Sequence, residues 1–165
     1  MAVNRWAEIS ECGTWRYALS RTWDESLPIG AFVGLNPSTA DGETDDNTIR
    51  KEIALAQRWG WGGFWKYNLF PFRSTDPDGL WRADDPLGER GDETLAEAVL
   101  RHSAAPIVAA WGTWKHPRFV ARVAKVLTGP LGDARLMCLA RAKDGQPRHP
   151  LYMPNDSPIV VWRNP

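Results

Sequence analysis

The sequence is poor in cysteine and in long apolar runs. Only two of its 165 residues are cysteines, Cys12 and Cys138. Neither has a second cysteine or a histidine at the spacing of a metal site. We therefore expect no zinc site, no iron–sulfur cluster, no disulfide and no cofactor. No apolar stretch approaches the roughly 18 residues of a membrane span, and the first ten residues lack the form of a signal peptide. These absences predict a cytoplasmic protein with no membrane partner.

An excess of charge of one sign is missing as well. Twenty Lys and Arg residues balance twenty Asp and Glu residues, so the formal net charge is +0. A balanced chain has no broadly basic surface for nucleic acid, although a local group of arginines can still bind phosphate. The chain is rich in tryptophan, with ten residues, and arginine outnumbers lysine. Both residue types suit flat or phosphorylated ligands, and both are equally compatible with core packing and codon usage.

The spacing of apolar segments predicts one α/β domain over residues 1–165. Because strands and helices alternate, we expect a three-layer αβα fold with a four-stranded, mainly parallel sheet and an N-terminal edge strand. The polar loop 73–90 is long, and long loops in compact domains are often functional. Strands are expected at residues 14–19, 29–35, 63–70, 106–112 and 135–139. Helices are expected at residues 45–59, 92–100 and 117–127.

Polar residues of a specific kind follow the predicted parallel strands. Ligands of open α/β sheets bind beyond the carboxyl ends of the strands, so these residues are the first candidates for a site. They occupy the segments 34–41, 68–73, 110–112 and 145–152.

In their order along the chain, these segments resemble the motifs of the uracil-DNA glycosylase superfamily. Gly34, Asn36 and Pro37 match its G-x-[N/D]-P motif, in the form found in the mismatch-specific and single-strand-selective branches. Asn68 matches the base-reading asparagine after the second strand, and His149 matches the histidine of the late H-P-S-P loop. The resemblance implies a uracil-DNA-glycosylase-like fold.

The sequence also resembles, over most of its length, an uncharacterised bacterial and phage family, the domain of unknown function 1643. This second family brings no established activity, so the chemistry has to be argued from the residues. The motifs that carry the resemblance are R-Y-x-L-x-R-x-W from Arg16, G-L-N-P-S-T-A-D from Gly34, D-D-N-T-I-R from Asp45, N-L-F-x-x-R-x-T-D-P from Asn68, A-W-G from Ala110 and P-R-H-P-L-Y from Pro147.

The glycosylase resemblance implies hydrolysis of the N-glycosidic bond of a modified or mismatched base, with a role in DNA repair or DNA modification. Such a reaction needs an oriented water and stabilisation of negative charge on the departing base. Asn36 is expected to hold the water, and His149 to donate a hydrogen bond to the base. Asn68 offers one acceptor and two donors to the edge of the base. Asp41 and Asp46 are the carboxylates that could activate the water.

Further contacts to the substrate are expected around these groups. One aromatic side chain among Phe70, Phe72, Trp111 and Trp114 should stack on the base. The late loop reads H-P-L-Y, which leaves Leu151 or Tyr152 for a minor-groove wedge. A local arginine-lined cleft would contact nucleic acid. The full set of expected substrate-binding residues is Gly34, Pro37, Ser38, Asn68, Phe70, Arg73, Trp111, Arg148 and Tyr152.

Other interpretations of the same residues stay open. The pocket could act on a free modified nucleotide or nucleoside, which the neutral net charge favours. It could also belong to a non-catalytic module that binds a base or a nucleic-acid end, because an amide cannot take a proton. Asp45 and Asp46 could cap the helix that follows them, and residues 36–38 could form only a turn. His102 and His116 are expected to have structural roles.

Overall fold

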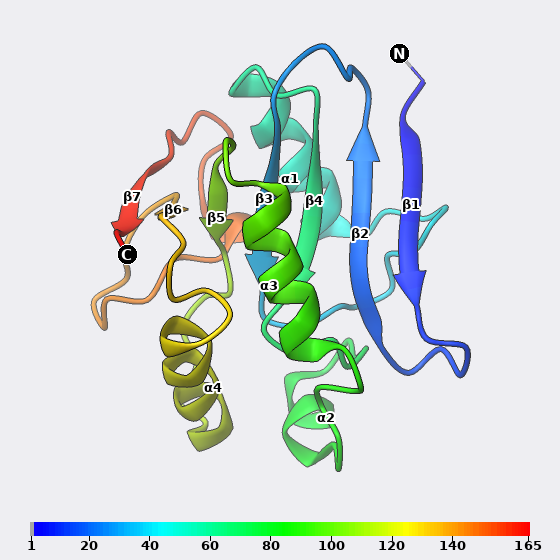
Figure 1. Ribbon diagram of the computed structural model, residues 1–165, viewed down its shortest axis with the longest axis vertical. Helices are drawn as coiled ribbons and strands as arrows, with labels where there is room; N and C mark the ends of the chain where they lie inside the picture. Colours follow the sequence, from blue (N-terminus) through cyan, green and yellow to red (C-terminus); the bar gives the residue numbers. More distant parts are fainter. Residues whose placement is uncertain (1) are drawn as a thin grey trace.

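A computed structural model describes residues 2–165, and its centre is a seven-stranded mixed sheet (Figure 1). The strands are β1 (Asn4–Ile9), β2 (Arg16–Thr22), β3 (Ile29–Gly34), β4 (Gly63–Asn68), β5 (Ile107–Ala109), β6 (Leu136–Cys138) and β7 (Val160–Arg163). They lie in the order β1-β2-β4-β3-β5-β6-β7. The α/β class predicted from the sequence is therefore confirmed.

The inner strands of the sheet are parallel and the outer strands are antiparallel. β3 pairs in parallel with β4 on one side and with β5 on the other, and β5 pairs in parallel with β6. β2 joins β4, β1 joins β2, and β7 joins β6, each in antiparallel orientation. The carboxyl ends of four neighbouring strands consequently meet at one edge, which is where α/β proteins bind ligands.

The two outermost strands were not expected from the sequence. An N-terminal strand does lie at the edge of the sheet, but it is β1. The strand predicted at residues 14–19 corresponds to β2, which is internal because it lies between β1 and β4. Residues of β1 and β7 are mostly exposed or half-buried. β1 mixes polar and apolar residues, so it lacks the apolar pattern that marks a buried strand. β7 is apolar, with the sequence V-V-W-R, but its four residues are too few to show a period.

Helices cover both faces of the sheet. The helices are α1 (Asn47–Arg58), α2 (Pro77–Arg82), α3 (Gly91–Arg101), α4 (Pro117–Thr128) and the short 3-10 helix η1 (Pro150–Tyr152). In Figure 1, α3 and α4 lie in front of the sheet and α1 lies behind it. Within residues 2–165, every helix is too short or too polar to cross a bilayer.

Alternating side chains of β3 divide the core between these two layers. Ala31 and Val33 belong to the apolar cluster that includes residues of α3 and α4. Phe32 belongs to the opposite cluster, together with Ile49 and Ala56 of α1. Because side chains of a strand alternate between faces, Gly34 continues the α1 face of β3 and ends it without a side chain. The side chains of Lys66 and Asn68 occupy this position, because a Cβ atom on Gly34 would lie 2.8 Å from Nζ of Lys66 and 2.9 Å from the side-chain oxygen of Asn68.

Helix α2 lies inside the segment that was expected to be a long loop. It has only six residues, and its signals are local: the side chain of Asp76 accepts a hydrogen bond from the backbone N–H of Asp78, and Pro77 occupies the first helical position. A helix this short shows no apolar periodicity, which explains why the sequence pattern did not reveal it.

Candidate functional site

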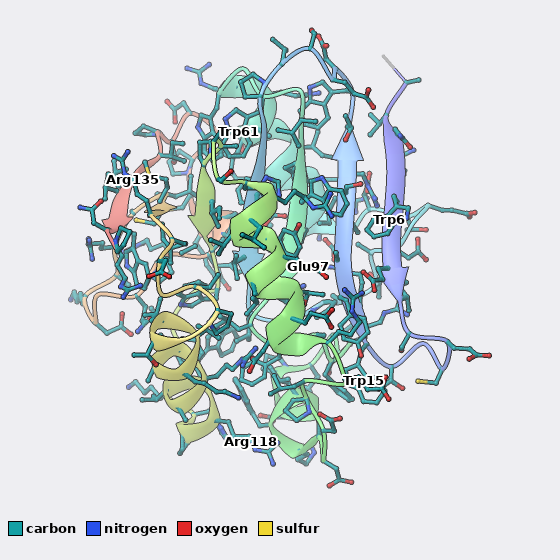
Figure 2. The ribbon with its side chains drawn as sticks, in the orientation of Figure 1. Trp6, Trp15, Trp61, Glu97, Arg118 and Arg135 are labelled. Carbon is teal, nitrogen blue, oxygen red and sulfur yellow. The ribbon has the colours of Figure 1, made fainter. Side chains whose placement is uncertain are left out.

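A cleft of about 760 Å³ lies at the carboxyl ends of β3, β4 and β5. Its walls come from the segment after β3, the end of β4, the turn after β5, the first turn of α1 and the loop that contains η1. Figure 2 places Arg118, in the first turn of α4, at this end of the sheet, and Trp61, just before β4, at the opposite end. The cleft therefore occupies the position that the strand-end rule predicts for an α/β protein.

His149 reaches the cleft from the turn that precedes η1. Its Nδ1 accepts a hydrogen bond of 3.2 Å from the backbone N–H of Leu151, which assigns the proton of the neutral ring to Nε2. Burial, assisted by the positive charge of Lys66 and opposed by Asp46, lowers the pKa of His149 to about 4. At neutral pH the ring is uncharged, and its Nε2–H can donate a hydrogen bond to a ligand.

Asn36 enters the cleft with its amide group fixed in one orientation. The amide nitrogen donates to the backbone carbonyls of Pro37 at 3.0 Å, Phe72 at 3.3 Å and Ser74 at 3.0 Å. Three carbonyl partners identify this atom as the nitrogen, because an amide oxygen could not donate to them. The side-chain oxygen of Asn36 is left as an acceptor for a ligand or a water in the cleft.

Asn68 ends β4 on the floor of the cleft and lacks hydrogen-bond partners. The residue is 4% exposed, and both its amide oxygen and its amide nitrogen are buried without a partner among residues 2–165. Buried amides in folded proteins are nearly always paired, and an unpaired one is destabilising by about 1–3 kcal/mol. A ligand that pairs with this amide would recover that free energy.

A buried ion pair on the cleft floor was not predicted from the sequence. Lys66 of β4 lines the cleft, is 4% exposed and donates to the side-chain Oε1 of Glu52 in α1. Burial raises the pKa of Glu52, although the charge of Lys66 opposes this effect. The second oxygen of Glu52 is buried without a partner in the described chain. The signal was available, since Lys66 is the one charged residue of β4 and follows Phe64 and Trp65.

Arg16 is a second buried cation in the wall of the cleft, and the sequence analysis did not predict it as a site residue. Its Nη1 donates to the carbonyl of Ala40 at 2.6 Å, whereas its Nε is buried and unpaired within residues 2–165. Burial lowers the pKa of Arg16 to about 10, so it remains charged at neutral pH. Arg16 opens the first motif shared with the uncharacterised family, and that motif was the signal for its importance.

Asp46 has both of the roles that the sequence left open for it. Its side chain accepts a hydrogen bond of 2.9 Å from the backbone N–H of Ile49 and so caps α1, and it also lines the cleft. Asp45 has neither role, because it pairs instead with the buried side chain of Arg21 at 2.7 Å. The expected site residues that line the cleft are Gly34, Asn36, Ser38, Asp46, Asn68, Arg148, His149 and Tyr152.

The remaining expected site residues do not line the cleft, and each has a structural reason. They are Pro37, Asp41, Phe70, Arg73 and Trp111. Trp111 is 0% exposed, donates to the side-chain oxygen of Gln146 at 2.9 Å and packs against Trp162. Phe70 is buried against Trp81, and Pro37 is buried.

The polar residues of this group are engaged in loops. The carboxylate of Asp41 accepts hydrogen bonds from the backbone N–H groups of Glu43 and Thr44, both at 2.8 Å, and these bonds lower its pKa. Arg73 donates to the carbonyl of Gly13 at 3.2 Å. Asp41 therefore closes a turn, and the carboxylate that faces the cleft is Asp46.

One tryptophan does line the cleft. Gly112 has a positive φ of 76°, which turns the chain after β5 and separates the environments of the tryptophans on either side of it. Trp111 stays in the core, whereas Trp114 lines the cleft and is fixed by a hydrogen bond of 2.8 Å from its Nε1 to the carbonyl of Trp111. Of the aromatic candidates for stacking, the structure brings only Trp114 to the site.

No arrangement of three or more His, Cys, Asp or Glu side chains suited to a metal ion occurs in the part of the chain that the structure describes. The polar groups of the cleft are amides, hydroxyls, the imidazole of His149, the carboxylate of Asp46 and three cationic side chains, those of Arg16, Lys66 and Arg148. These groups can orient a ligand or a water by hydrogen bonds.

The comparisons with known proteins return one family. A family model described as "Protein of unknown function (DUF1643)" matches residues 16–151. No curated protein and no solved structure matches the chain. The match begins at the buried Arg16 and ends at Leu151 beside His149, so it contains nearly all of the residues that line the cleft. Because the family model matches most of the length of the chain, the chain belongs to the DUF1643 family of proteins of unknown function.

Proposed function

We propose that the protein binds a nucleobase in this cleft and hydrolyses the N-glycosidic bond that joins a modified or mismatched base to its sugar. One observation carries the proposal. Asn36, Asn68 and His149 come from three separate segments of the chain, and all three line the same cleft. A volume of about 760 Å³ falls in the range of small-molecule sites and is large enough for one nucleotide.

The base would be recognised by hydrogen bonds and stacking. The unpaired amide of Asn68 offers a donor and an acceptor side by side, which is the pattern that the edge of a base requires. Trp114 supplies an aromatic surface on which any base can stack. Arg148 is exposed at the rim, where a guanidinium can contact a phosphate.

The departing base would be stabilised by His149. In hydrolysis the bond from the sugar C1′ to the base nitrogen breaks, the electron pair leaves with the base, and a bond forms from C1′ to the oxygen of water. The neutral imidazole of His149 would donate its Nε2–H to an oxygen of the base as that negative charge develops. A pKa of about 4 keeps the donor neutral, so it stabilises the anion without protonating it in advance.

The attacking water would be oriented by Asn36 and deprotonated by Asp46. The fixed amide of Asn36 leaves its oxygen to accept a hydrogen bond from the water. An amide cannot take the proton, and Asp46 is the carboxylate of the cleft lining that can accept it. The similarity of the motifs to those of the uracil-DNA glycosylase superfamily, in the same order along the chain, supports these assignments.

The proposal is tested by measuring the release of free base. Purified protein is incubated with single-stranded and duplex oligonucleotides that carry uracil, mismatched or hypermodified bases, and with the matching mononucleotides and nucleosides. Free base is separated by chromatography. We expect Asn36→Ala and His149→Ala to lower the rate of release by about 100- to 1,000-fold, the usual effect of removing one group that stabilises a transition state.

His116→Ala is the matched control. His116 also precedes a proline and also caps a helix through its Nδ1, but it does not line the cleft. This variant should release base at the rate of the wild type. Release that is unaffected by both Asn36→Ala and His149→Ala would contradict the site.

The same panel separates the alternative functions. Release from monomers but not from oligonucleotides would identify a nucleotide or nucleoside hydrolase. A rise in melting temperature with a ligand, without release from any substrate, would identify a binding module. The neutral net charge of the chain makes the monomer arm a necessary part of the experiment.

A further inference from the structure

Four Lys and Arg side chains are buried within residues 2–165, and one of them lacks a carboxylate partner. The other three form ion pairs: Arg21 with Asp45, Lys66 with Glu52, and Arg122 with Asp92. Arg16 is 2% exposed and forms no ion pair in the described part of the chain. A buried charge is strongly destabilising unless it is paired. The structure therefore contains one buried cation whose charge a ligand could neutralise.

Most hydrogen-bond donors of Arg16 are unused. A guanidinium carries five N–H donors, and in Arg16 only Nη1 has a partner within residues 2–165, the carbonyl of Ala40 at 2.6 Å. Nε is fully enclosed and unpaired. Nη2 is unpaired as well but is not fully enclosed, and Arg16 lines the cleft. Nη2 is thus the nitrogen that a ligand in the cleft can reach.

The carboxylates nearest in effect to Arg16 are already engaged. Burial lowers the pKa of Arg16 to about 10, and the charges of Asp46 and Glu52 oppose this decrease. Asp46 accepts the backbone N–H of Ile49 at the start of α1, and Glu52 accepts from Lys66. Arg16 remains charged at neutral pH, and neither carboxylate lies within bonding distance of it.

The rest of the cleft also favours an anion. Three cationic side chains and one carboxylate line it, although the formal net charge of the whole chain is +0. Thr48, in the first turn of α1, lines the cleft at the positive end of that helix. Ser38 lines it from the segment that Arg16 holds through Ala40. Phosphate fits such a site, because a guanidinium can donate to two of its oxygens at once.

We propose that Arg16 binds the phosphate of a free nucleoside monophosphate whose base lies beside Asn68 and His149. The proposal rests on the proposed binding of a base in the cleft, and it adds the class of substrate, a mononucleotide and not a nucleic-acid strand. A phosphomonoester ends the molecule, so it can approach a cation buried in the cleft wall, whereas a phosphodiester continues into chain on both sides. A monoester also carries about two negative charges at neutral pH, against one for a diester.

The proposal is tested by binding, which does not depend on hydrolysis. The dissociation constants of 2′-deoxyuridine, of its 5′-monophosphate and of a trinucleotide with deoxyuridine at its centre are measured by calorimetry. The trinucleotide has no terminal phosphate and so contains only phosphodiesters. We expect the wild-type protein to bind the monophosphate about ten- to a hundredfold more tightly than the nucleoside, the usual effect of a hydrogen bond to a charged group, and more tightly than the trinucleotide.

Arg16→Gln removes the charge and keeps an N–H donor for the carbonyl of Ala40. This variant should bind deoxyuridine like the wild type, with the preference for the monophosphate reduced to within about twofold. Its melting temperature should not fall, because the substitution removes an unpaired buried charge. A lower melting temperature with the preference intact would show that Arg16 only supports the segment around Ala40.

Arg118→Gln is the matched control. Nη1 of Arg118 also donates to a backbone carbonyl at 2.6 Å, that of Ala83, and Arg118 forms no ion pair in the described chain. It does not line the cleft, so this variant should keep the full preference for the monophosphate.

Three results would overturn the proposal: equal binding of nucleoside and monophosphate by the wild type, a preference that persists in Arg16→Gln, or a trinucleotide that binds as tightly as the monophosphate. Inorganic phosphate separates a failure of this proposal from a failure of the proposed function. Binding of inorganic phosphate that is lost in Arg16→Gln, without binding of any nucleoside, would support the phosphate site and contradict recognition of a base.

Discussion

The pairs His116-Pro117 and His149-Pro150 have nearly the same local structure and different surroundings. The backbone of His116 has φ −71° and ψ 136°, and that of His149 has φ −70° and ψ 137°. In both, Nδ1 accepts a hydrogen bond of 3.2 Å from the backbone N–H two residues later. His116 stacks on Trp81 with ring centroids 4.6 Å apart, whereas His149 lines the cleft beside the charge of Lys66.

The comparison shows that a His-Pro pair is first of all a helix start. The imidazole acts as the capping acceptor, and proline fits the first helical position because its missing N–H has no partner to lose there. The cap leaves Nε2 free in both histidines. Only the position of the turn relative to the sheet decides whether that second nitrogen faces a cleft or an aromatic ring.

The largest expected effect is on base release, and it separates the helix-capping role of His149 from its proposed role as a hydrogen-bond donor to the base. His149→Asn keeps a side chain that caps helices well but removes the Nε2–H donor. We expect base release to fall by about 100- to 1,000-fold with the melting temperature unchanged. The same substitution at His116 should leave both quantities unchanged. A His149→Asn protein that releases base at the wild-type rate would show that both histidines are only caps.

The second expected effect is a decrease in the free energy of unfolding at acidic pH, caused by protonation of His149 in the unfolded chain. Its pKa is about 4 in the folded protein, against an ordinary value of 6.5. Between these values the unfolded chain binds a proton that the folded chain does not, so stability is lost as the pH falls through this window, by up to about 3 kcal/mol.

Urea unfolding at a series of pH values between 7 and 4 measures this slope. His149→Asn should reduce the loss of stability, and His116→Asn should retain it in full. His102, whose pKa burial also lowers, contributes in the same direction and is present in both variants. Equal slopes in the two variants would exclude His149 as the source.

The third effect concerns the charge beside His149. Burial is the main cause of its low pKa, and Lys66 is the second. Lys66→Met/Glu52→Gln should therefore raise the pKa of His149 above 4 while it stays below the ordinary value of 6.5. Titration of the imidazole resonances by NMR measures the pKa of His149. An unchanged pKa in the double variant would show that the charge of Lys66 does not contribute to it.

The smallest expected effect is the loss of a cap. His116→Ala removes the acceptor at the start of the twelve-residue helix α4 and should lower the free energy of unfolding by about 1 kcal/mol. His116→Asn should restore most of it. Urea unfolding at pH 7 measures both variants. If His116→Ala leaves the free energy of unfolding unchanged, stacking on Trp81 and the packing of α4, rather than the cap, fix this turn.

Much of the fold was predictable because it depends on the pattern of apolar residues within short segments. Short apolar runs marked β3, β4 and β5, and apolar stripes marked α1 and α4, since burial on one or both faces imposes these periods directly on the sequence. The strands β1 and β7 were not predicted because their residues are largely exposed. Helix α2 was not predicted because six residues are too few to show an apolar periodicity.

The candidate site was predictable to the extent that it lies at strand ends. The rule that ligands bind at the carboxyl edge of the sheet predicts that Asn36, Asn68 and His149 lie near one another, and all three line the cleft. The rule does not say which neighbouring side chain turns inward. Trp111 and Trp114 both follow β5, and the positive φ of Gly112 decides that one is core and the other lines the cleft.

The sequence by itself determined the inner strands, the helices α1, α3 and α4, and the group of polar residues at the strand ends, because each depends on residues a few positions apart. Only the tertiary structure decided that Lys66 pairs with Glu52, that the amide of Asn68 has no partner, and that His149 and not His116 faces the cleft. The physical reason is burial. Removal from water sets the cost of an unpaired amide and the pKa of an imidazole, and residues far apart in the chain determine it together.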